Sequence, residues 1–102
     1  MSFSVLMSVY HKENPLFLSG ALNSVYSQTV KPTEVVLVQD GPLTKELYSV
    51  INSWKNKLNI IDVIIASNVG LGEALNQGLQ HCSYELVARM DTDDIALPMR
   101  FE

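Results

Sequence analysis

Short apolar runs alternate with helical patterns along the chain, and this order limits the possible folds more than any other feature. Three of the runs, around Val5, over 35–38 and over 60–65, are nearly continuous in apolar residues instead of alternating with polar ones. Strands that are covered on both faces have this pattern, and parallel sheets are built from such strands. We therefore predict strands over residues 3–9, 34–39, 60–66 and 84–90.

Three helical patterns separate these runs. Asn14 is placed to cap the first helix, and Pro15 suits its first position. In each pattern the apolar residues recur at the spacing of one buried helix face. The predicted buried faces are Leu18, Ala21, Leu22 and Val25, then Leu47, Val50, Ile51 and Trp54, then Leu71, Leu75, Gly78, Leu79 and Cys82. We expect Gly78 to let the third helix approach the sheet closely.

The resulting order, βαβαβαβ, predicts an α/β fold with three Rossmann-like layers. The sheet is expected to be mostly parallel, with helices on both faces, because crossovers between parallel strands are right-handed. This topology collects the carboxyl ends of the strands along one edge. Open α/β sheets bind their ligands there, so the functional residues are expected at that edge.

Composition narrows the ligand classes. The 102 residues allow one domain, and the net charge is −4 with seven scattered Lys and Arg residues, which gives no basic face for nucleic acid. A phosphate-bearing ligand would therefore need a metal ion or backbone amides. The single cysteine, Cys82, fits a reducing compartment, and no apolar stretch approaches the roughly 18 residues of a membrane span. We expect a soluble cytoplasmic segment without a signal peptide.

Polar and acidic residues gather where the predicted strands end. They are Ser8, Tyr10 and Glu13 after the first strand, Asp40 after the second, Asn68 and Gly70 after the third, and Asp91, Asp93 and Asp94 after the fourth. Carboxylates as close together as those around Thr92 repel each other unless a cation offsets them. Their oxygen atoms suit Mg²⁺ or Mn²⁺, which also bind substrate phosphates. The alternative is a solvated acidic turn in which Asp94 caps the next helix.

The other strand-end residues each leave two interpretations open. Asp40 could accept a hydrogen bond from a base N–H, or it could stabilise the Gly41-Pro42 turn. The glycine-bearing segment 68–72 could bring backbone N–H groups to a phosphate, or it could be an ordinary turn into a helix. The ring of Tyr10 could stack on a base or cover the edge of the core.

Five blocks of the sequence, in this order and at this spacing, resemble the start of family-two glycosyltransferases. These blocks are residues 4–10, 21–29, 34–41, 68–76 and 88–94. The resemblance implies the GT-A fold of nucleotide-diphospho-sugar transferases and a metal-dependent hexosyltransferase that uses Mn²⁺ or Mg²⁺. It also implies transfer from a nucleotide-sugar donor, usually a UDP-sugar, to an acceptor hydroxyl with inversion. The acceptor would be a saccharide or a lipid-linked molecule, in polysaccharide or glycoconjugate biosynthesis.

Carried over position by position, the resemblance implies a donor site and a metal site. The donor site would comprise Ser8, Val9, Tyr10, Glu13, Asp40, Asn68, Gly70, Asp91 and Thr92, with Asp40 at the base. Asp91 and Asp93 match the DxD motif, and Asp94 is an adjacent acidic candidate, so these three would hold the metal.

The chain also departs from the family pattern. Leu75 stands where the family often has an arginine, and Gln39 precedes Asp40 where a second aspartate is common. Family members continue beyond the DxD motif into an acceptor half that carries a catalytic carboxylate. We therefore expect residues 1–102 to be the donor-binding part of a truncated domain, with the catalytic base beyond Glu102. Such a part would bind nucleotide weakly and transfer nothing alone. The full-length protein would be cytoplasmic and peripheral at the inner face of the membrane.

Two other functions are alternatives to a glycosyltransferase. A sugar nucleotidyltransferase would have a glycine-rich, basic loop after the first strand, and segment 8–12 contains no glycine. A non-catalytic, metal-binding receiver-like module would assemble its acidic pocket near the first and third strands. The acidic cluster here follows the fourth strand, which argues against that module.

Overall fold

The computed structural model describes residues 2–91 of the chain. Strands and helices follow one another as the sequence predicts. They are β1 (Ser4–Val9), α1 (Pro15–Tyr26), β2 (Glu34–Asp40), α2 (Lys45–Trp54), β3 (Ile60–Ile65), α3 (Leu71–Leu79) and β4 (Val87–Arg89).

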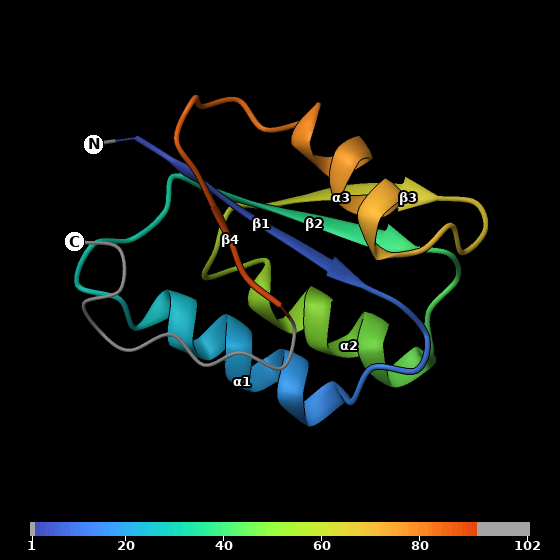
Figure 1. The fold of residues 1–102 in the computed structure, drawn as a ribbon. Coiled ribbons are helices and arrows are strands. Elements are labelled where there is room, and N and C mark those ends of the chain that lie inside the picture. Colours follow the sequence, from blue (N-terminus) through green and yellow to red (C-terminus); the bar gives the residue numbers. More distant parts are fainter. Residues whose placement is uncertain (1, 92–102) are drawn as a thin grey trace.

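The four strands form one sheet in the order β3-β2-β1-β4, and all neighbouring pairs are parallel (Figure 1). Val5 on β1 pairs with Val35 on one side and with Ala88 on the other. β4 is shorter than the predicted strand over 84–90, because its ladder with β1 begins only at the pair Ser4–Val87. The parallel sheet confirms the predicted topology.

Helices α1 and α2 cover one face of the sheet and α3 covers the other, which gives three layers (Figure 1). The larger core cluster lies between the sheet and the α1–α2 pair. Its fully buried members include Val5, Met7, Leu18, Leu22, Val35, Leu37 and Leu47. A smaller cluster under α3 includes Leu6, Val36, Val38, Val63, Ile65 and Ala74. The molecule is therefore the predicted three-layer α/β fold, and strands β1 and β2 are buried on both faces.

The first two helices form where the sequence places them. Asn14 caps α1, with its side-chain oxygen accepting a hydrogen bond from the Leu16 amide at 2.8 Å. Thr44 caps α2 in the same way through the Leu47 amide at 3.2 Å. The four predicted apolar residues of α1 are all buried, whereas in α2 Leu47 and Ile51 are buried and two others pack partly against the core.

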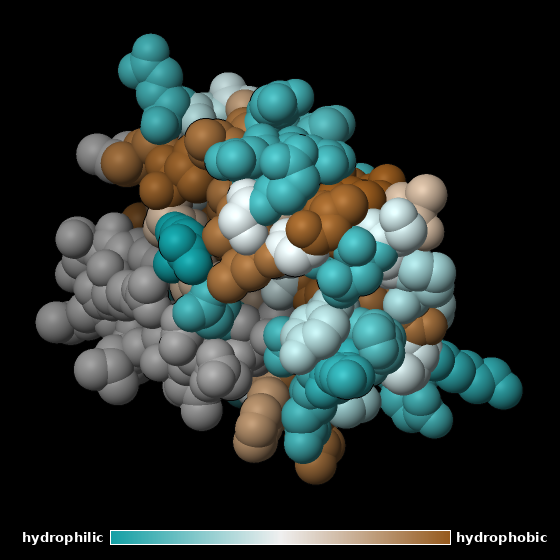
Figure 2. All heavy atoms as spheres, turned by 45° about the vertical axis from the view of Figure 1, so that its right-hand side comes forward, coloured by the Kyte–Doolittle hydropathy of each residue, from teal (hydrophilic) through white to brown (hydrophobic). Residues whose placement is uncertain are grey.

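Helix α3 buries part of the predicted face, since Leu75, Gly78 and Cys82 pack toward the sheet but Leu71 and Leu79 do not. Ala74 and Gly78 lie against the sheet, while Leu71 and Leu79 are 51% and 52% exposed. A Cβ on Gly78 would lie 2.7 Å from Cδ1 of Leu6, so the absent side chain allows the helix to pack this closely. The expected close approach at Gly78 is confirmed. Figure 2 shows apolar residues reaching the surface between hydrophilic ones.

Within residues 2–91, no helix is both long enough and apolar enough to cross a lipid bilayer.

Candidate functional site

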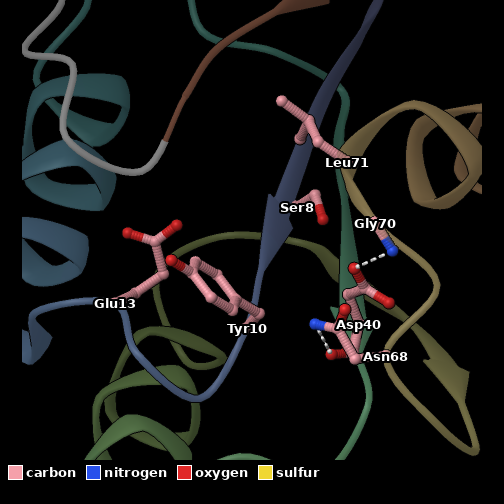
Figure 3. Close-up of a pocket in the computed structure, with 7 residues that line it drawn as sticks. All are labelled: Ser8, Tyr10, Glu13, Asp40, Asn68, Gly70 and Leu71. Carbon is pink, nitrogen blue, oxygen red and sulfur yellow. Dashed lines mark hydrogen bonds between the residues drawn. The ribbon is translucent and has the colours of Figure 1, made fainter.

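A pocket of about 330 Å³ lies at the edge of the sheet where β1 and β2 end and the loop after β3 begins. Its lining residues are Ser8, Tyr10, Glu13, Asp40, Asn68, Gly70 and Leu71 (Figure 3). Such volumes are at the lower end of small-ligand sites. Three separate connections therefore meet at the carboxyl edge, which is where an open parallel sheet binds ligands.

The structure brings together six of the residues proposed for donor binding, namely Ser8, Tyr10, Glu13, Asp40, Asn68 and Gly70. Val9 does not join them. Side chains alternate across a strand, so Val9 points to the face opposite Ser8, where it is 1% exposed and part of the larger core. Its side chain belongs to the core, so a donor contact at Val9 would involve its backbone.

Leu71 lines the pocket although the sequence analysis assigned it to a buried helix face. It is the first residue of α3, and its side chain is half exposed. The signal that could have found it was its position directly after Gly70, where the loop from β3 becomes a helix at the ligand-binding edge.

Asp40 is the buried acid of the pocket, with 3% of its surface exposed. Its Oδ1 accepts a hydrogen bond from the Val69 amide at 2.8 Å, and its Oδ2 accepts one from the Gly70 amide at 3.1 Å. The side-chain amide of Asn68 donates to the Asp40 carbonyl oxygen at 3.3 Å (Figure 3). The carboxylate thus accepts hydrogen bonds from the β3–α3 loop, a further role that the sequence did not predict.

These bonds also occupy two backbone amides of segment 68–72. The amides of Val69 and Gly70 are directed to Asp40, so they are not the groups that would approach a phosphate. A carboxylate offers about four acceptor positions, so Asp40 keeps the capacity to accept a further hydrogen bond from a ligand.

Gly41 brings the two strand-end loops into contact. Its φ of +83° lies in the left-handed region, and a Cβ there would stand 2.8 Å from the backbone nitrogen of Asn68. A residue with a side chain would be strained at this position and would push the loop away.

Tyr10 and Glu13 form the other wall of the pocket. Both come from the connection after β1, and Figure 3 shows their side chains across the pocket from Asn68 and Gly70. The Glu13 amide donates to the Tyr10 carbonyl at 3.1 Å, which closes a turn. The Tyr10 ring is 37% exposed and meets the His11 ring edge-on, at a centroid distance of 5.7 Å. An accessible aromatic face opposite a polar loop can stack on a planar ligand group.

Of the predicted metal ligands, the described residues include only Asp91. Its Oδ1 lies 3.8 Å from a guanidinium nitrogen of Arg89, and both side chains are more than half exposed. β4 runs parallel to β1, so Asp91 lies beyond the strand toward the same edge as Ser8. Thr92, Asp93 and Asp94 lie outside the described residues. Within residues 2–91, no three His, Cys, Asp or Glu side chains are grouped to hold a metal ion.

A second buried acid, Glu34, lies at the start of β2, at the end of the strand opposite Asp40. Its Oε2 accepts hydrogen bonds from the Ser4 hydroxyl and from the Ser83 amide, both at 2.7 Å. Burial raises the pKa of this carboxyl, but the hydrogen bonds from Ser83 and Ser4 outweigh burial, and the net pKa is lowered. Glu34 thus joins β1, β2 and the turn after α3, away from the pocket.

The sequence matches a family model described as glycosyl transferase family 2 over residues 4–102. One relative is the UDP-Gal:alpha-D-GlcNAc-diphosphoundecaprenol beta-1,3-galactosyltransferase of Escherichia coli, 55% identical over 98% of this chain. Another is the amylovoran biosynthesis glycosyltransferase AmsE of Erwinia amylovora, 51% identical over 98% of this chain. The chain spans only 36% and 38% of the length of these two relatives.

Solved structures agree with the family model. TarS (1–349) of S. aureus in complex with UDP has a TM-score of 0.83 and 30% identity over 97% of this chain, which covers 29% of that chain. The mannosyltransferase PcManGT of Pyrobaculum calidifontis, in complex with GDP-Man and Mn²⁺, has a TM-score of 0.80 and 26% identity. The match covers 96% of this chain and 29% of the mannosyltransferase chain. The family match thus favours the glycosyltransferase over the nucleotidyltransferase and receiver alternatives, and this GT-A chain belongs to glycosyl transferase family 2.

Proposed function

We propose that residues 1–102 form the donor-binding part of a glycosyltransferase that transfers a sugar from a UDP-sugar to an acceptor hydroxyl with inversion. The observation that carries this proposal is the pocket at the carboxyl edge of the sheet. It combines an accessible ring at Tyr10, a buried carboxylate at Asp40 and a hydroxyl at Ser8 in a member of the family.

The choice of uridine nucleotide draws on the relatives. The Escherichia coli relative is named for UDP-Gal, and TarS structures contain UDP and UDP-GlcNAc. In this chain Tyr10 would stack on the base, and the remaining acceptor capacity of Asp40 would face a base N–H. Ser8 and Glu13 would meet the ribose side of the nucleoside.

A divalent ion, Mn²⁺ or Mg²⁺, would be held by Asp93 with Asp91 and Asp94. Asp91, the one member of this set among the described residues, is accessible and follows β4 at the same edge as Ser8. The mannosyltransferase relative of known structure contains Mn²⁺ with its donor. When bound, such an ion offsets the charge on the departing nucleoside diphosphate. Thr92 would contact the donor beside it.

The chain spans 36% and 38% of the length of the Escherichia coli and Erwinia amylovora relatives. We propose that the acceptor site and the general base lie outside residues 1–102, and that the 102-residue chain alone binds nucleotide without transferring sugar. A lipid-linked saccharide acceptor, as in the name of the Escherichia coli relative, would place the complete enzyme at the inner face of the membrane. A carboxylate outside residues 1–102 would deprotonate the acceptor hydroxyl.

Isothermal titration of the chain with UDP, with and without Mn²⁺, tests the proposal. We expect UDP binding that Mn²⁺ strengthens, and weaker binding of ADP, whose larger base and different hydrogen-bonding edge do not match the same contacts. Equal affinity for UDP and ADP, or no UDP binding at any Mn²⁺ concentration, would contradict the donor assignment.

A further inference from the structure

Three hydrogen bonds join Asp40 to the loop between β3 and α3. The Val69 and Gly70 amides donate to the two carboxylate oxygens at 2.8 and 3.1 Å, and the Asn68 side chain donates to the Asp40 carbonyl at 3.3 Å. The carboxylate is almost completely buried. Hydrogen bonds to a charged acceptor are stronger than neutral ones, so the two bonds to the carboxylate connect the loops strongly.

Helix α3 begins without a side-chain cap of its own. Its N-cap residue is Gly70, which has no side chain to accept a hydrogen bond, whereas Asn14 and Thr44 cap α1 and α2. The Asp40 carboxylate lies at the Gly70 amide, and it also places a negative charge at the positive end of the α3 dipole. A residue of β2 therefore anchors the residue at which α3 begins.

We propose that Asp40 is a positioning residue, which fixes loop 68–70 and the first turn of α3 before any nucleotide binds. Asn68, Gly70 and Leu71 then form their wall of the pocket in the ligand-free protein. This role is separate from a direct contact between Asp40 and a base. The loop-holding role stands on the structure alone, and only its effect on nucleotide affinity rests on the proposed function.

Amide hydrogen exchange, followed by NMR on the ligand-free 102-residue chain, tests the loop-holding role. In Asp40→Ala we expect the Val69 and Gly70 amides to exchange about tenfold faster or more, because both lose their acceptor. Asp40→Asn keeps one acceptor oxygen, so it should fall between Ala and the wild type. Slow exchange at the amides of β1 shows that each variant is folded. If Asp40→Ala does not fold by this criterion, the comparison is made with Asp40→Asn.

A matched control is Asp62→Asn. Asp62 is a carboxylate on β3 that accepts from Gln39 at 3.2 Å and pairs with Lys55, without contact to the loop. Its substitution should leave the Val69 and Gly70 amides unchanged. Wild-type exchange at both amides in folded Asp40→Asn would overturn the proposal, as would the same acceleration in Asp62→Asn.

Affinities for UDP and CDP supply the functional readout. The two ligands share ribose and diphosphate but present opposite hydrogen-bonding groups at base position N3. A fixed loop wall serves both, so we expect both affinities to fall, in the order wild type, Asn, Ala. The affinity for UDP should fall further, because UDP also loses the proposed contact of its base N–H with Asp40. Loss for UDP alone would overturn the link between the loop and affinity. If the wild type binds neither nucleotide, the proposed function is wrong. The hydrogen-exchange result still shows whether Asp40 holds the loop.

Discussion

The backbone nitrogen of Asn68 lies 2.8 Å from the point that a Cβ on Gly41 would occupy. The two residues follow neighbouring strands, β2 and β3, and their contact holds the strand-end loops together at the pocket. Gly41 also has a φ of +83°, which other residues rarely adopt. The contact and the backbone conformation therefore both require glycine.

We expect Gly41→Ala to destabilise the chain by roughly 1–3 kcal/mol, because the new methyl group meets backbone that cannot rotate away. Urea denaturation measures the change. Gly20→Ala is the matched control, since Gly20 is in helix α1 with nothing within 4 Å of an added Cβ. That control should be neutral or stabilising by about 0.5–1 kcal/mol. Equal stability changes for the two variants would contradict the close approach.

Gly78→Ala should also destabilise, because its Cβ would overlap the side chains of Leu6 and Val38. Overpacking typically destabilises by about 1–3 kcal/mol. The better helix propensity of alanine offsets up to about 1 kcal/mol of this. The same denaturation measurement applies. Gly72→Ala in the same helix meets no atom within 4 Å and should show only the gain. If Gly78→Ala proved as stable as Gly72→Ala, the packing of α3 on the sheet would be wrong.

We expect the contribution of Glu34 to the free energy of unfolding to be lost in acid. Its folded pKa is lowered below the ordinary value of 4.5, so the stabilisation is complete above 4.5 and is lost as the pH falls through the folded pKa. Near neutral pH, Glu34→Gln should cost roughly 1–3 kcal/mol, because the Ser4 and Ser83 donors lose a charged acceptor. The neighbouring Cys82 does not titrate in this range, since burial and then the Glu34 charge raise the pKa of its thiol.

Urea denaturation of both proteins at a series of pH values measures this effect. The difference in unfolding free energy between the wild type and Glu34→Gln should shrink below pH 4.5. A difference that stays constant down to acid unfolding would show that Glu34 is not the group responsible.

Tyr10→Ala should weaken UDP binding about tenfold, because stacking of a base on an aromatic ring contributes roughly 1–3 kcal/mol. Tyr10→Phe keeps the ring and should bind nearly as the wild type does. The matched control is Tyr26→Ala, whose ring is 38% exposed against 37% for Tyr10 but lies in α1, outside the pocket lining. Titration calorimetry with UDP gives the affinities of the wild type and of the three variants. A comparable loss in Tyr26→Ala would remove the assignment of Tyr10 to the base.

The sequence predicts the strand and helix order well because the apolar runs and the Asn14 cap are local signals. It is only partly right for α3, where regular spacing correctly selected Leu75, Gly78 and Cys82 but missed the buried Ala74. The spacing also selected Leu71 and Leu79, which the rotation of the helix leaves half exposed. Packing between elements decides that rotation, and spacing along one helix does not contain it.

The candidate site shows the same division. The topology alone places Ser8, Tyr10 and Asp40 at one edge, and the pocket confirms that they meet. The bonds from Val69 and Gly70 to Asp40 depend on the conformation of a loop far away in sequence, so the sequence left open whether those amides approach a phosphate or form an ordinary turn. Strand alternation turns the Val9 side chain into the core, so only its backbone remains for the expected donor contact.

The central claim is that the carboxylates around Thr92 hold a divalent ion that in turn holds a nucleoside diphosphate. Its most direct test is the UDP affinity of the wild type and of Asp93→Ala, each titrated with and without Mn²⁺. We predict that Mn²⁺ strengthens UDP binding by the wild type about tenfold or more, and that Asp93→Ala loses this increase while keeping the metal-free affinity. An unchanged Mn²⁺-dependent affinity in Asp93→Ala would contradict the account.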